Sequence, residues 1–106
     1  MSIVDEYNLG ERDFSYRDLR HANLNGVNLE HANLRYTNLN GADLDFSCLP
    51  LSCGSLKMIV DKRIAVQIAY HLCSLKCDDP EFQDIRLKIL DFANQMHRVD
   101  VPRLVK

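Results

Sequence analysis

The chain has 106 residues, of which 13 are Lys or Arg and 15 are Asp or Glu, so its formal net charge is −2. A charge this close to zero gives no electrostatic argument for binding nucleic acid or a membrane surface. No apolar run approaches the ~18 residues that a membrane-spanning helix needs, and the N-terminal segment lacks the basic start and apolar stretch of a signal peptide. We therefore expect a cytoplasmic protein whose four cysteines are free thiols in a reducing compartment.

The composition changes near residue 56. Residues 1–56 contain four Arg against eight acidic residues, a net charge of −4, and seven of the eight Asn. Residues 57–106 contain nine Lys or Arg against seven acidic residues, a net charge of +2. We predict two parts, a polar repetitive part over 1–56 and a C-terminal cap over 57–106.

The first part repeats every five residues. Its central positions are Leu9, Phe14, Leu19, Leu24, Leu29, Leu34, Leu39, Leu44 and Leu49, and Asn or Asp precedes each of them except the last. Neither the period of an amphipathic helix nor the alternation of a strand fits this pattern. One inward Leu per repeat, with a small residue two positions earlier, indicates a coil that turns a corner in each repeat. Its layers would pair above and below as in a β-ladder.

Two Asn-Gly pairs, Asn25-Gly26 and Asn40-Gly41, occupy the same phase of the repeat. Taken alone, each pair is typical of a hairpin turn. Because their phase is identical, we predict that both pairs are corners of the coil instead.

The pattern resembles the pentapeptide-repeat family, whose motif A-[DN]-L-x-x is matched by ANL at 22–24, ANL at 32–34 and ADL at 42–44. The resemblance covers about residues 7–51. It implies a mainly β fold with an α cap, namely a right-handed quadrilateral β-helix with four repeats in each turn and about two and a half turns. Arg12 stands where the family has a small residue.

Arg17 departs from the motif in the same way. We expect the first turn to be open at its end, with the side chains of Arg12 and Arg17 in solvent. Four repeats per turn would also place residues twenty apart on one face, with Tyr16 beneath Tyr36 and Gly26 beneath Phe46.

A stack of Tyr16 on Tyr36 has two possible interpretations. It is either a ladder that supports the coil or an aromatic patch that docks a partner protein. The candidate partner-binding face consists of outward aromatic and acidic side chains: Tyr16, Tyr36, Phe46, Glu30, Asp43 and Asp45.

The five-residue pattern fails at Gly54, and residues 52–60 are predicted to leave the coil as an extended strand. A helix is predicted over about 61–75, with Asp61 as its N-cap. A second helix is predicted over about 79–97, because its first residues, Asp-Pro-Glu, supply a cap, a Pro at the first helical position and an acid in the first turn. Such a helical hairpin could cap the coil, since a short solenoid exposes its core at the ends.

Apolar residues exceed what one helix face needs. Leu87 and Leu90 lie off the apolar face of the second helix, and the first helix adds Val66 and Tyr70 to the surplus. This surplus predicts a homodimer interface through the helices, and the family resemblance implies the same. The alternative is a monomer with a wide core.

No group of residues points to catalysis. Cys48 and Cys53 are one repeat apart and Cys73 and Cys77 are one helical turn apart, so a zinc site or a disulfide is an alternative to free thiols. Neither spacing is that of a zinc ribbon, and unpaired Cys behaves as a small hydrophobe. With no phosphate-binding Gly loop and no Ser-centred elbow, we predict no enzyme activity, no metal and no cofactor.

The leading prediction is a non-catalytic protein-interaction module. Some members of the family resemble duplex DNA in shape and charge and bind type II topoisomerases such as DNA gyrase. The resemblance therefore implies a bacterial or phage protein that binds and inhibits or modulates another protein, such as a topoisomerase, a nuclease or another DNA-handling enzyme. Arg20 and Arg35 interrupt the outward acidic residues, which argues against a continuous DNA-like face. The alternative is a structural scaffold that self-associates through its helices.

Overall fold

A computed structural model describes residues 2–50, 56–97 and 100–106 of the chain. Contacts divide the chain into two units, Met1–Asp61 and Lys62–Lys106. We expected the division after residue 56, but Ile59 still pairs with the coil, so the first unit extends further. Part of the predicted exit strand, residues 52–55, lies outside the described residues, as does Cys53.

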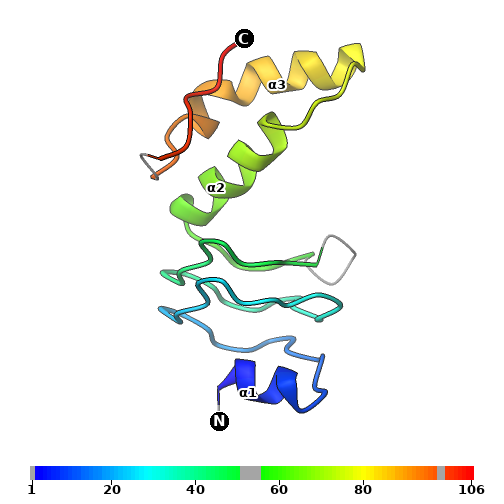
Figure 1. Cartoon of the computed structure of the whole chain (residues 1–106), viewed down its shortest axis with the longest axis vertical. Coiled ribbons are helices and arrows are strands. Elements are labelled where there is room, and N and C mark those ends of the chain that lie inside the picture. The colour runs from blue at the N-terminus through cyan, green and yellow to red at the C-terminus, as the bar shows by residue number, and fades with distance from the viewer. Residues whose placement is uncertain (1, 51–55, 98–99) are drawn as a thin grey trace. The chain divides into compact units, whose positions relative to one another are not determined.

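The first unit is a coil whose layers pair at a fixed register. Parallel bridges join residues whose numbers differ by 20, namely Asp13 with Asn33, Asp18 with Asn38, Asn23 with Asp43 and Asn28 with Cys48. Four five-residue repeats therefore make one layer, and Figure 1 shows these layers stacked on one another. A bridge from Asn38 to Ile59 spans one residue more, so the register shifts where the third layer begins. Within the described residues each pairing is an isolated bridge and no extended strand forms.

The hydrogen bonds of one repeat explain why it turns so often. In residues 37–41 all five backbone N–H groups have acceptors. From Thr37 to Gly41 these are Leu34 O, Arg17 O, Ile59 O, Asn38 Oδ1 and Asp61 Oδ2. Two of the bonds close turns and the other three reach neighbouring layers, so no buried donor is left unpaired.

The Asn or Asp before each central residue has a structural role. Its Oδ1 atom accepts the backbone N–H two residues later, which is the geometry of an Asx turn. This bond recurs in seven successive repeats, at Asp13, Asp18, Asn23, Asn28, Asn33, Asn38 and Asp43. The motif therefore requires an Asn or Asp oxygen at this position.

Each corner also contains a residue with positive φ, two positions after the central residue. The φ angles lie between 59° and 75° at Tyr16, His21, Gly26, His31, Tyr36, Gly41 and Phe46. The carbonyl of the central residue accepts the N–H three residues on, as in a turn of type II. The prediction that both Asn-Gly pairs form corners of the coil is confirmed.

The central residues fill the interior of the coil. Those fully or nearly fully buried are Phe14, Leu19, Leu24, Leu29, Leu34, Leu39 and Leu44. Thr37, at a position where the motif has a small residue, is also buried, and its hydroxyl donates to Phe14 O at 3.0 Å. Leu9 is 76% exposed, so the repeats do not begin there as predicted.

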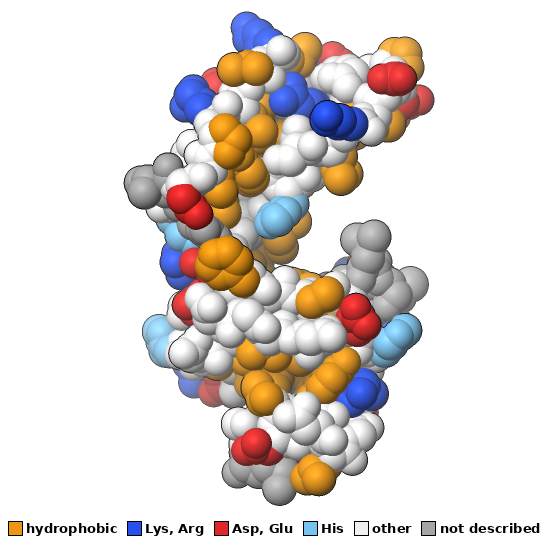
Figure 2. Space-filling model, in the orientation of Figure 1, with side chains coloured by type: hydrophobic (Ala, Val, Ile, Leu, Met, Phe, Trp, Pro, Cys, Tyr) orange, Lys and Arg blue, Asp and Glu red, His pale blue; other side chains and the backbone are white. Residues whose placement is uncertain are grey.

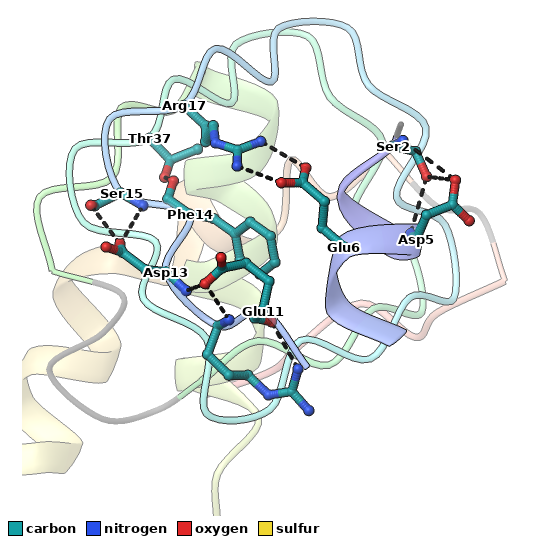
Figure 3. Close-up of polar contacts among 10 residues, drawn as sticks. Ser2, Asp5, Glu6, Glu11, Asp13, Phe14, Ser15, Arg17 and Thr37 are labelled. Carbon is teal, nitrogen blue, oxygen red and sulfur yellow. Dashed lines mark hydrogen bonds and ion pairs between the residues drawn. The ribbon is translucent and has the colours of Figure 1, made fainter. Parts of the chain in front are cut away.

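A short helix, α1 (Ile3–Asn8), stands where the first repeat was expected. Ser2 and Asp5 form a capping box at its start, because each side chain meets the backbone N–H of the other. Figure 3 shows this box and the pairing of Glu6 from α1 with Arg17 from the coil. The first turn is therefore contacted by α1, and Arg17, whose side chain is 40% exposed, is paired with that helix instead of extending freely into solvent as expected.

Arg12 was also expected in solvent, and that expectation is wrong as well. Its guanidinium lies 3.6 Å from the centre of the Tyr7 ring and donates to Tyr7 O at 2.8 Å. The Tyr7 hydroxyl in turn donates to Glu30 O in the coil at 2.8 Å. Both arginines therefore connect the coil to the helix before it.

The second unit contains helices α2 (Lys62–Cys73) and α3 (Pro80–Ala93), where two helices were predicted. Asp79 caps α3 as predicted, since its side chain accepts the Phe82 N–H at 3.0 Å. Tyr70, Cys73, Leu90 and Ala93 form the buried core of this unit.

The C-terminal segment completes that core. Val101 and Leu104 pack against it. The Asn94 side chain donates to Leu104 O at 2.9 Å and accepts the Leu104 N–H at 2.8 Å. Two hydrogen bonds from one amide thus hold the segment after α3 in place.

Candidate functional site

Two tyrosines stack on the outside of the coil. The ring centres of Tyr16 and Tyr36 are 4.9 Å apart and their planes differ by 9°. Their backbones are held in register, because the Tyr16 N–H donates to Arg35 O at 3.0 Å. Tyr16 is 75% exposed and Tyr36 is 45% exposed. The predicted contact between these residues is confirmed.

Basic side chains accompany the tyrosines. The Tyr36 N–H donates to Lys57 O at 3.1 Å, so Lys57 continues the same column in the third layer. We define the aromatic corner as residues 15–17, 35–37 and 56–58. These nine residues include Arg17, Arg35 and Lys57 and no acidic residue.

Arg17 is already engaged by the helix before the coil. Its guanidinium donates two hydrogen bonds to the Glu6 carboxylate, at 2.8 and 2.7 Å (Figure 3). The bonds from Arg17 lower the pKa of Glu6, and Glu6 raises the pKa of Arg17. Arg35 and Lys57 are both exposed.

Phe46 and two carboxylates of the predicted face lie elsewhere. We define the Phe46 corner as residues 25–27 and 45–47, since the Gly26 N–H donates to Asp45 O at 2.8 Å. Phe46 is 69% exposed. Asp43 flanks this corner and accepts hydrogen bonds from the Asp45 N–H and the Asn25 amide. The Phe46 corner is two repeats from the aromatic corner in a turn of four, so the two are not adjacent.

Glu30 lies at a third corner. Its N–H donates to Asn28 Oδ1 at 2.9 Å, and Cys48 Sγ lies 3.9 Å from its carboxylate. The register therefore places the six predicted binding residues at three different corners. It brings Tyr16 and Tyr36 together, and Asp43, Asp45 and Phe46 together, but it does not join these groups into one face.

The predicted dimer residues differ in their exposure. Leu87 is 50% exposed, whereas Val66, Tyr70 and Leu90 are 3%, 8% and 6% exposed. The Tyr70 hydroxyl also donates to Pro102 O. The C-terminal segment packs against the core around Tyr70 and Leu90, so these two predicted dimer residues are buried within the helical unit.

Other apolar side chains of the helical unit are exposed. Along α2 and just after it, they form one stripe at helical spacing. Ile68 and Leu72 belong to α2, and Leu75 follows its last residue, Cys73. Figure 2 shows hydrophobic side chains along the helical unit, with charged side chains between them. The sequence shows the helical spacing of residues 68, 72 and 75, but only their exposed fractions in the structure distinguish this stripe from the core.

The described residues were also searched for reactive thiols, metal ligands, cavities and membrane-spanning helices. Cys48, Cys73 and Cys77 are free thiols, with Cys73 buried. No group of three or more potential ligands for a metal ion occurs in the described part of the chain. An open hollow of about 250 Å³ is lined by Lys62, Arg63, Val66, Gln95 and His97. Among the described helices, none combines the length and the hydropathy needed to cross a bilayer.

Comparison with known families agrees with the register. The family model described as pentapeptide repeats matches residues 13–48 in eight copies. That segment begins at the bridge of Asp13 and ends at the bridge of Cys48. Residues 13–48 therefore carry pentapeptide repeats, as the resemblance predicted, and proteins with such repeats are generally non-catalytic interaction or structural modules. No curated protein and no solved structure matches the chain.

Proposed function

We propose that this protein is a non-catalytic interaction module whose coil binds another protein through the aromatic corner. The coil in this proposal is a right-handed quadrilateral β-helix of about two and a half turns, which agrees with four repeats in each layer. Such a scaffold supplies rigidity, because the backbone N–H groups of a repeat such as 37–41 are all bonded, three to neighbouring layers and two within turns.

The exposed tyrosine stack is the observation that carries the proposal. The rings of Tyr16 and Tyr36 are held 4.9 Å apart by paired backbones, so they lose little conformational freedom when a partner binds. Tyr is enriched at protein interfaces because it offers a large apolar area together with a hydroxyl. A ladder that only supports the coil has no need of a side chain that is 75% exposed.

The distribution of charge on the coil bears on the class of partner. Inhibition of a nucleic-acid-handling enzyme by DNA mimicry would need a continuous acidic face. The acidic groups of the coil are instead divided between corners, and Asp18 and Glu6 are paired with arginines. The surface therefore favours recognition of a protein segment over imitation of a duplex.

The test is affinity capture with three tagged proteins: wild type, Tyr16→Ala/Tyr36→Ala, and Phe46→Ala. Phe46→Ala is the matched control, because it removes one exposed aromatic side chain at a different corner. Nuclease treatment removes contacts bridged by nucleic acid. We expect a protein retained by the wild type and by Phe46→Ala and lost with the tyrosine variant. Equal retention by all three folded proteins would overturn the proposal.

A second candidate function is a scaffold that self-associates through its helices. It is favoured by the exposed stripe of Ile68, Leu72 and Leu75, which would bury apolar area against a second copy. Leu72→Asp should then convert a dimer into a folded monomer, as measured by light scattering after gel filtration. A wild type that is monomeric over the accessible concentration range would exclude this candidate.

A further inference from the structure

The N-terminal end of the coil is an edge whose backbone groups face outwards. In the second layer, the Asn or Asp before a central residue points both of its backbone groups at the layer beneath. At Asn38 the N–H donates to Arg17 O at 2.9 Å, and the carbonyl accepts the Leu19 N–H at 2.9 Å. Three exposed residues hold the same position in the first layer, which has no layer beneath it: Asp18, Asn23 and Asn28.

Each of these three residues offers one donor and one acceptor to the outside. Within the described residues, the backbone N–H and carbonyl of Asp18, Asn23 and Asn28 make no hydrogen bond. Asp13, in the remaining repeat of the layer, differs because its N–H donates to Glu11 Oε1 at 2.9 Å. Residues in the hydrogen-bonded pairs of an antiparallel ladder exchange both of their N–H···O bonds. The first layer therefore has an edge that can pair in three of its four repeats.

Helix α1 stands over the core at this end of the coil. Figure 1 shows α1 beneath the first layer, and Ile3 of this helix is 7% exposed. Phe14 of the first layer is fully buried although no further layer covers it. The pair of Glu6 with Arg17 and the bond from the Tyr7 hydroxyl to the coil hold the helix in place. Covering an edge with a helix is one way in which proteins prevent strands of different molecules from pairing.

We propose that the N-terminal end of the coil is a surface for a second copy of this chain, and that α1 keeps this surface closed. When α1 undocks, the first layers of two copies pair antiparallel through the backbone groups of residues 18, 23 and 28. Two like ends that meet about a twofold axis form a closed dimer. This inference goes beyond the proposed function and does not depend on the aromatic corner.

The spacing of the unpaired groups selects a second copy as the occupant. Residues 18, 23 and 28 belong to three successive repeats, and the chain turns a corner between one and the next. An extended peptide continues in one direction at ~3.3 Å per residue, so it can pair with one repeat only. A second coil turns at the same intervals and presents matching groups to all three repeats.

The test compares full-length variants in a Leu72→Asp background, which removes self-association through α2. The opened variant adds Glu6→Ala and Tyr7→Ala, because these substitutions remove two polar contacts of α1. Sedimentation velocity over a range of protein concentrations gives the dimer dissociation constant, and circular dichroism checks the fold. We expect Leu72→Asp to be a monomer and the opened variant to dimerise at least about tenfold more tightly. A folded opened variant that remains monomeric would overturn the inference.

A pair of single substitutions tests whether the dimer uses this edge. Asn28→Asp keeps the turn, as Asp43 does in the second layer, but it brings like charges together across the proposed interface. Gln95→Glu is the matched control, because it adds the same charge at an exposed residue of the helical unit. We expect Asn28→Asp alone to weaken the dimer of the opened variant, by about tenfold or more. Equal effects of the two substitutions would place the interface elsewhere and contradict the proposal.

Hydrogen exchange provides a second readout if the opened variant does not fold. Glu6→Gln keeps α1 but weakens its pair with Arg17. As the concentration of this variant rises, the Asn23 N–H should become protected, because it gains an acceptor in the second copy. The Asn25 N–H is the internal control, since it is already bonded to Asn23 Oδ1 at 3.1 Å. Exchange at Asn23 that does not depend on concentration would overturn the inference.

Discussion

At the residue scale, the positive φ at each corner explains which residues are tolerated there. An L-residue in the left-handed region costs roughly 1–2 kcal/mol compared with Gly. Tyr16 and Tyr36 adopt this conformation, but so do His21 and His31. The strained backbone is therefore a property of every corner and is not evidence for function at the tyrosines. The exposed stack is what distinguishes the aromatic corner.

Two glycines in the same conformation provide a matched pair of variants. A Cβ added to Gly26 would meet open space, whereas one added to Gly41 would overlap the His21 ring. We expect Gly26→Ala to reduce the free energy of unfolding by about 1 kcal/mol through its φ alone. Gly41→Ala should cost about 0.5–1.5 kcal/mol more, because the His21 ring must leave its rotamer.

Urea denaturation measures both losses. In a His21→Ala background the added Ala at residue 41 has no ring to displace, so the two glycine substitutions should become equivalent. Equal losses in the wild-type background would show that His21 does not lie over Gly41.

Asp18 predicts how stability depends on pH. Hydrogen bonds from the Arg20 side chain, followed by its backbone N–H, lower the pKa of Asp18 to about 2 from an ordinary 3.8. A carboxylate with a lowered folded pKa stabilises the fold above its ordinary pKa and loses that contribution as the pH falls towards the folded value. Asp18→Asn keeps the turn, as Asn23 does in the next repeat, but it cannot titrate.

The urea midpoints of wild type and Asp18→Asn should therefore converge as the pH falls from about 4 to about 2. NMR titration of the Asp18 carboxyl gives the folded pKa independently. A difference between the two proteins that is constant over this pH range would contradict the assignment.

At the element scale, α1 is bound to the first layer of the coil by a few polar contacts. The Arg17–Glu6 pair is partly exposed, at 40% and 23% for the two side chains. Ile3 is the buried apolar residue of this helix. A helix of six residues is too short to be stable alone, so its order depends on these contacts.

Arg17→Met tests that dependence. The substitution keeps an unbranched apolar stem but removes the ion pair, so α1 should open more often. We expect faster amide hydrogen exchange at the N–H groups of Glu6 and Leu9, with little change at Leu29 in the coil. Arg20→Met is the control, because its pair with Asp18 lies within one repeat. Unchanged exchange in α1 would show that the pair does not hold the helix.

The sequence predicted the repeats and the two C-terminal helices, but it did not predict the short helix α1. Periodicity of the central residues located the repeats from Asp13 to Cys48, because an inward apolar residue preceded by the Asn or Asp of an Asx turn recurs every five residues. The helix α1 was missed, although Ser2 and Asp5 have the spacing of a capping box. A repeat that was extended back to Leu9 concealed that local signal.

At the scale of the whole molecule, the candidate site depended on pairings that sequence order does not reveal. Charges that alternate along the chain are separated by a register of 20 residues, so Arg35 and Asp45 lie at different corners. In the helical unit, the tail around Leu104 packs against the core that contains Leu90, and no local pattern predicts that contact. The six residues of the predicted binding face therefore lie at three corners, and three of the four predicted dimer residues are buried within the helical unit.

The register itself is the central claim, since the aromatic corner, the separation of charge and the proposed partner all depend on it. A double-mutant cycle with Tyr16→Ala and Tyr36→Ala, measured by urea denaturation, tests it most directly. We predict a coupling energy of about 0.5–1.5 kcal/mol for this pair. The matched cycle of Tyr16→Ala with Phe46→Ala should give a coupling near zero, because those residues lie at different corners. Absence of coupling between Tyr16 and Tyr36, or equal coupling in both cycles, would contradict the account.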